Sequence, residues 1–409
     1  MGEKRDAPPS RIALLGLGLN SYLNPNLESA LRRTFPGYQI DWIDLERLVR
    51  KRSAGLIPWL NLGYAVREFF PKMGLRLWQL KRRHRWTANL FRQRSLAAVE
   101  MLSKRQYLFS LQTQSTFDAS VPGVPHFVYT DNTLLANLQY KNTSKNDLPV
   151  TDKWLALERQ LYHNACACFV MSRNVGRSLM EDYQCDPNKV VCAYGGYNAP
   201  LEEVDEGKSY DRKNILFVGL DWERKGGPEL VDAFRSVRQQ IPDATLTIVG
   251  CSPSVNEPGC QVVGRIPPSE LGRYYTKASV FCLPTRHEPF GIVFLEAMAH
   301  KLPIVATNVA AIPDFVTNGE NGFLVSPGDI QGLTEGLVRV LSSPELCRQM
   351  GERSHAVSQT YTWDNSAAIM REVIQRFVRV QDCPARAGSF ADGGGEAFIG
   401  TASPADIDS

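Results

Sequence analysis

Short apolar runs alternate with amphipathic segments along most of the 409-residue chain. In the first half, the apolar run at 11–15 is broken by Gly16-Leu17-Gly18 and followed by a helical pattern at 25–34, which predicts a strand, a glycine turn and a helix. Further strands are expected at 39–43, 107–110, 126–130, 168–171 and 190–193. Buried strands that alternate with helices are typical of parallel sheets with helices on both faces, an α/β fold.

A second series of the same kind starts near Asn214. Strands are expected at 215–218, 245–249, 261–263, 280–283, 304–306 and 322–325, and helices at 228–240, 269–277, 292–300 and 363–380. The polar, irregular segment 201–213 predicts an interdomain linker. We therefore expect two domains, 1–200 and 214–362, and a C-terminal helix at 363–384 that crosses back to the first domain.

Composition excludes several classes of protein. With 43% hydrophobic and 22% charged residues, the chain is neither collagen-like nor a coiled coil, although the Gly- and Ser-rich segment 385–409 predicts a disordered tail. No apolar run of about 18 residues predicts a membrane-spanning helix, and the first ten residues lack the apolar core of a secretory signal. Nine scattered cysteines without a Cys-x-x-Cys pair favour reduced thiols and argue against zinc. These features predict a cytoplasmic enzyme.

The net charge of +3 conceals an asymmetry along the chain. From Arg47 to Arg105, fifteen Lys and Arg residues stand against two acids, Glu68 and Glu100. Within this stretch, the segment 69–94 interleaves basic and aromatic residues, as do surfaces that bind anionic membranes, anionic substrates or nucleic acid. A solvated helical face is an equally good interpretation, and nucleic acid is the least favoured one.

The region around two glutamates is the most informative about chemistry. Glu288 is expected in a loop after a strand, and Glu296 follows two helical turns later, so both carboxylates can lie on one side. The amides of Phe290, Gly291 and Ile292 lie at the predicted helix start, where free N–H groups favour an anion such as a diphosphate. Carboxylates that bind hydroxyls beside an anion site suit a nucleotide sugar. On spacing alone, however, two solvent-facing helix charges are the simpler interpretation.

The sequence around these glutamates resembles the retaining GT-B glycosyltransferases of family 4, the group 1 transferases. The resemblance extends from Asn214 to about Val380 and is carried by the segments at 283–300, 302–307, 312–314, 318–325 and 327–329. Upstream, the segments at 216–219, 225–226, 248–250 and 263–264 follow in the family's order. The first half matches more weakly, through 12–18, Ser172, 189–190 and 195–196.

The resemblance implies two Rossmann-like domains that face each other across a cleft, with the acceptor bound by the first and the donor by the second. It implies that Glu288 contacts the transferred sugar, that Glu296 binds the nucleotide ribose and that Lys225 binds the donor phosphates. It also implies transfer with retention of anomeric configuration and no requirement for a metal or cofactor, because cationic groups and helix N-termini neutralise the leaving group.

Further donor contacts are implied in the same way. Gly264 and Arg265 lie where relatives bind the base, and the backbone of Gly219 belongs to the donor loop. The amides of Phe290, Gly291 and Ile292 would hold phosphate and sugar, and the turn containing Gly16 and Gly18 would close over the diphosphate from the first domain.

Three departures from the family pattern affect these expectations. Leu220 follows Gly219 where many relatives have arginine, and Arg224 is the candidate substitute. Ala310-Ala311 replaces a usual glycine pair, a milder change. No histidine follows Asp131, so Asp131 and Asn132 become the candidates for sugar or acceptor contacts, while the neighbouring His126 is expected to be structural.

We therefore predict a glycosyltransferase that uses a UDP- or GDP-linked sugar and a carbohydrate or lipid-linked acceptor. A catalytically silent nucleotide-sugar-binding protein and a GT-B sugar-nucleotide epimerase are the alternatives, and a nucleic-acid module is the least favoured. A peripheral contact of the segment 69–94 with an anionic membrane stays open beside the interpretation as a solvated helical face.

Overall fold

The computed structural model describes residues 11–18, 23–52, 57–73, 86–139, 151–198 and 208–379. The chain divides into two compact units, and each is described by itself: unit 1 is Met1–Tyr194 with Ala367–Ser409, and unit 2 is Gly195–Ser366. The tail expected at 385–409 and the first part of the linker expected at 201–213 lie outside the described residues.

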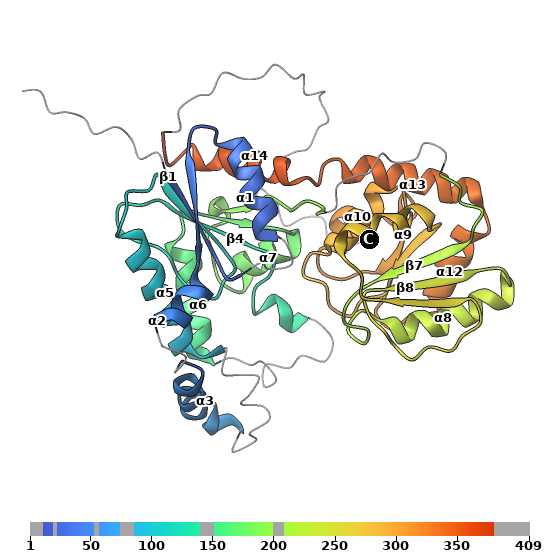
Figure 1. The fold of residues 1–409 in the computed structure, drawn as a ribbon, viewed down its shortest axis with the longest axis horizontal. Coiled ribbons are helices and arrows are strands. Elements are labelled where there is room, and N and C mark those ends of the chain that lie inside the picture. Colours follow the sequence, from blue (N-terminus) through green and yellow to red (C-terminus); the bar gives the residue numbers. More distant parts are fainter. Residues whose placement is uncertain are drawn as a thin grey trace, which may run out of the picture. The chain divides into compact units, whose positions relative to one another are not determined.

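Unit 1 is built on a six-stranded parallel sheet in the order β2-β1-β3-β4-β5-β6 (Figure 1). Its strands are β1 (Arg11–Gly16), β2 (Gln39–Asp44), β3 (Phe109–Thr113), β4 (His126–Thr130), β5 (Ala167–Val170) and β6 (Val190–Cys192). Its helices are α1 (Leu23–Thr34), α2 (Leu45–Arg52), α3 (Ile57–Met73), α5 (Ala88–Leu102), α6 (Asp152–Asn164) and α7 (Arg173–Glu181), with 3₁₀ turns η3 (Ala136–Gln139) and η4 (Pro187–Lys189).

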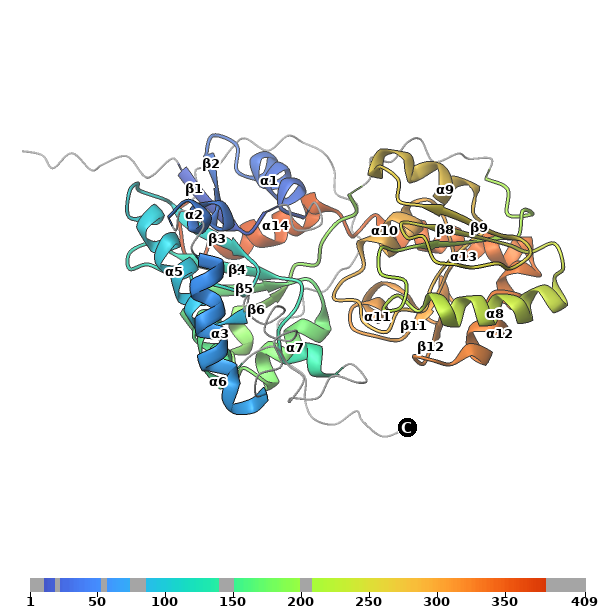
Figure 2. The same cartoon turned by 60° about the horizontal axis from the view of Figure 1, so that its bottom comes forward.

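Unit 2 contains a second six-stranded parallel sheet, in the order β12-β11-β10-β7-β8-β9. Its strands are β7 (Asn214–Val218), β8 (Thr245–Val249), β9 (Cys260–Gly264), β10 (Val280–Leu283), β11 (Ile304–Thr307) and β12 (Gly322–Val325). Its helices are α8 (Gly227–Gln240), α9 (Gly272–Lys277), α10 (Ile292–Ala299), α11 (Ile312–Phe315), α12 (Ile330–Leu341) and α13 (Pro344–Ser358), with the 3₁₀ turn η5 (Pro268–Glu270). Helices α8 and α12 lie on one face of the sheet, and α9 and α10 lie on the other (Figures 1 and 2).

The core of unit 1 explains why the last helix, α14 (Trp363–Ile374), returns to it from Ala367 onward. One face of the sheet carries a ladder of phenylalanines, with Phe127 in contact with both Phe109 and Phe169. Phe377, just after α14, packs its ring 5.6 Å from that of Phe127. Phe377 stays 47% exposed, so it covers the edge of this aromatic cluster and its ring contact with the buried Phe127 ties the end of the chain to unit 1.

In each sheet the direction in which successive strands are added reverses once. This winding reversal lies between the neighbouring strands β1 and β3 in unit 1, and between β7 and β10 in unit 2. Open parallel sheets bind ligands at the carboxyl ends of the strands that flank such a reversal, where successive loops diverge. The loops after β1, β3, β7 and β10 are therefore the first places to look for a site.

Three predicted elements differ from the observed ones. Strand β3 is shifted toward Thr113 because the buried Gln112 forms hydrogen bonds to the carbonyls of Gln114 and Phe117, so a polar residue is accommodated in a central strand. The helix expected at 269–277 begins as the 3₁₀ turn η5, and α9 starts only at Gly272. The last helix ends at Ile374, where i→i+3 bonds tighten the final turn.

Within the parts of the chain that the structure describes, no helix has both the length and the apolar composition needed to span a membrane. The same described residues hold eight cysteines, and all are free thiols.

Candidate functional site

The winding reversal of unit 2 joins two loops that are about sixty residues apart in sequence. The loop after β7 reaches Arg224, whose carbonyl accepts hydrogen bonds from the amide of Arg286 at 2.9 Å and from the hydroxyl of Thr285 at 3.3 Å. The Arg224 guanidinium in turn donates to the carbonyl of His287 at 2.6 Å. These bonds hold the loop after β7 against the loop after β10.

A buried ion pair lies where the two loops meet. The ammonium of Lys225 contacts the carboxylate of Glu288, and the two side chains are only 10% and 9% exposed. Burial, together with the neighbouring Arg224 charge, lowers the pKa of Lys225 from 10.5 to about 7, and the Glu288 carboxylate favours the charged ammonium. The site thus holds one cation that can pair with an incoming phosphate and one carboxylate that can accept a hydrogen bond from a hydroxyl group.

Glycine at 226 permits this close approach. Gly226 has φ +74°, and a Cβ atom there would overlap the carbonyl of Pro284 in the opposite loop. Gly219 also lies here, since a Cβ at that position would be 3.2 Å from Cγ of Lys225. Predicted donor residues from two separate segments are thereby brought together.

The start of α10 lies in the same loop. Gly291 has φ +95° and precedes the helix, and no side chain of the described residues caps this end. Phe290 is buried, and its ring centroid lies 6.2 Å from that of Phe315 on α11. This packing anchors the loop to the core of unit 2. The backbone at Gly291 and Ile292 is therefore suited to an anion through helix-end N–H groups.

Glu296, the second glutamate, is buried on α10 and is held by residues that the sequence did not single out. The hydroxyl of Tyr275 on α9 donates to Oε2 of Glu296 at 3.0 Å. The ring of His300 stacks on Tyr275 with centroids 5.1 Å apart, and its Nδ1 lies 2.8 Å from the carbonyl of Glu296. In the sequence Tyr275 reads as an ordinary core aromatic, so no local pattern could reveal this role.

If Glu296 binds the nucleotide ribose, as the resemblance implies, we expect Tyr275→Phe to weaken that recognition, because Glu296 loses the hydrogen bond that orients it. Removal of one hydrogen bond to a charged group costs about 1.5–3 kcal/mol, roughly a tenfold or greater rise in KM with little change in kcat. Binding of UDP and GDP should be compared with that of their 2′- and 3′-deoxy analogues, and the penalty for the missing hydroxyl should shrink in the variant. Tyr274→Phe is the matched control, since that hydroxyl bonds Arg273 instead; an equal effect in both variants would contradict the assignment.

The pKa of Lys225 predicts a pH dependence. Its ammonium is the form that attracts a diphosphate, and it is lost as the pH rises through about 7 in the free protein. We therefore expect the affinity for a nucleotide sugar, whose diphosphate does not titrate in this range, to fall up to tenfold per pH unit above 7. Burial and the Arg224 charge lower this pKa and the Asp221 carboxylate raises it, while the Glu288 carboxylate is in direct contact with the ammonium. A titration at several pH values checks this, and Lys225→Met should show a flat profile.

The region assigned to the base is at the end of β9. Gly264 has φ +81°, its carbonyl accepts from the amide of Gly250 at 2.8 Å, and a Cβ there would be 3.0 Å from the hydroxyl of Ser252. Arg265 follows as an exposed side chain. Both lie at the carboxyl edge of the same sheet as Lys225, two strands from β7.

In unit 1 the glycine turn lies at the winding reversal next to β3. A Cβ on Gly16 would overlap Thr113 and Trp42, so only glycine fits between these side chains. Gly18, at φ +58°, donates its amide to Asp44 at 3.4 Å and accepts at its carbonyl from Asn24 at 2.7 Å. The turn is thus a fixed backbone feature of the carboxyl edge.

Asp131 and Asn132 follow β4 at the same edge of the sheet. Burial raises the pKa of Asp131 above 3.8. The Asn132 side chain is engaged within its own loop, since it donates to Asn137 at 2.6 Å and accepts from the amide of Thr133 at 2.9 Å. His126 lies inside β4 between Ser110 and Gln112, and burial lowers its pKa to about 4, which agrees with a structural role.

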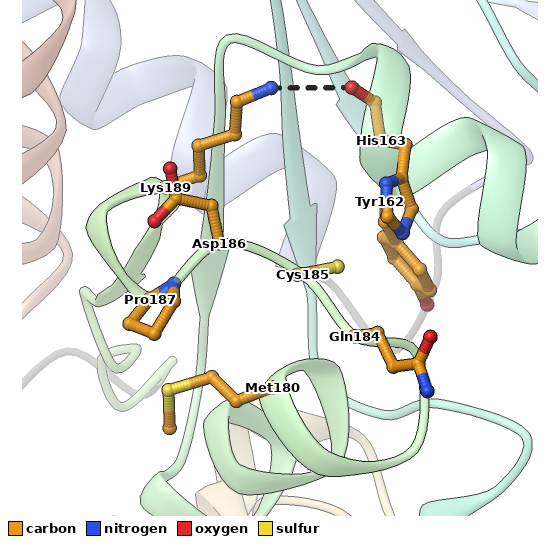
Figure 3. Close-up of a pocket in the computed structure, with 8 residues that line it drawn as sticks. All are labelled: Tyr162, His163, Met180, Gln184, Cys185, Asp186, Pro187 and Lys189. Atoms are coloured by element: carbon orange, nitrogen blue, oxygen red, sulfur yellow. Dashed lines mark hydrogen bonds between the residues drawn. The ribbon is translucent and has the colours of Figure 1, made fainter.

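A separate cavity of about 470 Å³ lies at the amino ends of β5 and β6, at the opposite edge of the sheet from the glycine turn (Figure 3). Its lining residues are Tyr162, His163, Met180, Gln184, Cys185, Asp186, Pro187 and Lys189. The ammonium of Lys189 already donates to the carbonyls of His163 and Ala165. No group of three or more potential metal ligands occurs here or elsewhere among the described residues.

Comparison with known proteins finds a family match within the second unit. Residues 212–343 match the family described as Glycosyl transferases group 1. A D-inositol 3-phosphate glycosyltransferase of Corynebacterium aurimucosum is 27% identical over 289 residues, which cover 63% of this chain and 68% of that relative.

Solved structures support the fold over nearly the whole chain. A sucrose-phosphate synthase from Thermosynechococcus elongatus is similar with a TM-score of 0.61 at 18% identity, covering 90% of this chain and 98% of that one. WaaG, a glycosyltransferase involved in lipopolysaccharide biosynthesis, is similar with a TM-score of 0.58 at 13% identity. The match covers 88% of this chain and 98% of WaaG. The expected GT-B fold is thereby confirmed, and residues 212–343 match a glycosyl transferases group 1 domain.

Proposed function

We propose that this protein is a retaining, family 4 glycosyltransferase that moves a sugar from a UDP- or GDP-linked donor to a carbohydrate or lipid-linked acceptor. The observation that carries the proposal is the buried contact of Lys225 with Glu288 beside the uncapped start of α10. A diphosphate is bound by cations and N–H groups, and a sugar hydroxyl is bound by a hydrogen-bond acceptor such as a carboxylate. Lys225, the start of α10 and Glu288 supply these groups next to one another.

The residues suggest how transfer would proceed. Lys225, Arg224 and the amides at Gly291 and Ile292 would stabilise the charge that develops on the departing nucleoside diphosphate. The bond from the anomeric carbon to the phosphate oxygen breaks, the acceptor oxygen bonds the same carbon, and the acceptor proton passes to the leaving phosphate on the same face. Glu288 would hold the sugar during this step, and no metal or cofactor is part of the proposal.

Arg224 is the proposed substitute for the arginine that many relatives have after the first glycine. Leu220, which occupies that position, has a 67% exposed side chain. The Arg224 guanidinium instead reaches the Glu288 loop through the His287 carbonyl. Asp131 and Asn132 are proposed as contacts to sugar or acceptor, with Asp131 the freer of the two because the Asn132 side chain is used within its loop.

Release of UDP or GDP from a panel of nucleotide sugars, with and without acceptors, tests the proposal. Turnover that Glu288→Gln abolishes supports a transferase. Nucleotide-sugar binding without release across the panel would favour the catalytically silent binding protein, which Leu220 and the missing histidine motivate. An epimerised nucleotide sugar as product would favour the epimerase.

We also propose a cytoplasmic protein that contacts anionic membranes peripherally through 69–94 and does not bind nucleic acid. Residues 74–85 of this segment lie outside the described part. At its described end, α5 exposes Arg92, and one turn further Leu96 is 65% exposed. An apolar side chain beside a basic one suits an anionic lipid surface.

A further inference from the structure

A second cavity in unit 1, of about 560 Å³, lies at the carboxyl edge of the sheet where β2 ends and α2 begins. The described residues that line it are Asp44, Glu46, Arg47, Arg50 and Lys51. This volume is typical of sites that hold small molecules.

The cavity is attached to the glycine turn. One carboxylate oxygen of Asp44 accepts hydrogen bonds from the amides of Gly18, Glu46 and Arg47, at 3.4, 3.0 and 3.2 Å. Strand β2 pairs with β1, and Gly16 lies opposite Asp44 in the register. The cavity is therefore one strand away from the winding reversal of unit 1, at the edge where such sheets bind ligands.

The charges that line the cavity are unbalanced. Glu46 pairs with Arg50 at 2.8 Å, and Asp44 is used by backbone amides. Arg47 and Lys51 are exposed, and the described part of the chain provides neither with an ion-pair partner. They are also four residues apart on one helix face, a spacing at which like charges repel each other and destabilise a helix slightly. The helix therefore carries a small cost that a bound anion would remove.

We propose that this cavity binds a phosphomonoester group carried by the acceptor. Arg47 supplies a planar guanidinium for two phosphate oxygens and Lys51 a mobile point charge, and both groups are common in phosphate sites. The inference rests on the proposed transferase function for its link to an acceptor, but the anion site itself involves only unit 1. A soluble sugar or polyol phosphate and a phosphorylated lipid headgroup share this chemistry.

Two probes of the same headgroup chemistry separate these sources: glycerol 3-phosphate in solution and vesicles containing phosphatidic acid, with phosphatidylcholine vesicles as reference. Binding to the full chain is measured by calorimetry and cosedimentation at constant ionic strength. The variant Arg47→Gln/Lys51→Gln is compared with the parent, and Lys104→Gln is the control, because Lys104 is an exposed lysine of the same unit paired with Glu100. Lys225 is retained throughout, so any phosphate binding there cancels in the comparison.

We expect at least tenfold weaker binding of one probe by the double variant and unchanged binding by Lys104→Gln. Without ligand, the double variant should be as stable as the parent or slightly more stable, since the repulsion is gone. Selective loss with glycerol 3-phosphate assigns a soluble acceptor, and selective loss with the vesicles assigns a lipid headgroup. Equal binding by parent and double variant, or equal loss in the control, overturns the proposal. Binding of UDP or GDP, measured separately, tests the donor site and is expected to be unaffected.

Discussion

Lys225→Met is expected to lower kcat/KM for a nucleotide sugar by about 10²–10³, the usual cost of removing one group that stabilises developing charge in a protected site. The ammonium is buried beside Glu288 and faces the loop that leads into α10, so no water can replace it fully. Steady-state release of UDP or GDP measures the change. Lys277→Met, an exposed lysine on α9 of the same unit, is the control and should be nearly neutral.

The same variant should also be less stable. It leaves the Glu288 carboxylate buried without its cation, and removal of one partner of a buried pair typically costs about 3–5 kcal/mol. Urea unfolding of unit 2 should therefore begin at lower concentration. Full activity in a folded Lys225→Met variant would remove the lysine from the proposed mechanism.

Glu288→Gln is expected to lower kcat/KM by a similar factor of about 10²–10³, because an amide cannot match a carboxylate as an acceptor for a sugar hydroxyl. Its stability should suffer less than that of Lys225→Met. With the pKa of Lys225 at about 7, the orphaned lysine can shed its proton near neutral pH instead of remaining as a buried charge.

The comparison of the two variants just below pH 7, where Lys225 of the parent is still mostly charged, therefore separates catalysis from folding. Both lose activity, and only Lys225→Met loses much of its unfolding free energy. Glu335→Gln, an exposed glutamate on α12, is the control for the amide substitution. Comparable destabilisation by Lys225→Met and Glu288→Gln would mean that Lys225 stays charged when Glu288 is neutralised.

Much of the candidate donor site could be predicted from local sequence. Glu288, Gly291 and Glu296 belong to one continuous segment, so local pattern places a loop and a helix start in the right order, whereas the burial of both carboxylates is visible only in the structure. Tyr275 could not be predicted, because its partner Glu296 is 21 residues away on another helix. For Asn132 the sequence predicted a ligand contact, but the structure shows that its side-chain amide already forms hydrogen bonds within its own loop.

The sequence by itself determined the two parallel α/β sheets and the segments that carry the donor chemistry, because apolar periodicity and glycine turns act over a few neighbouring residues. Only the tertiary structure decided which of these segments meet. The pair of Lys225 and Glu288 joins positions 63 residues apart, and it exists because β7 and β10 are neighbours at the winding reversal. The cavity at the start of α2 likewise depends on β2 lying beside β1, since local pattern carries no information about which strands pair.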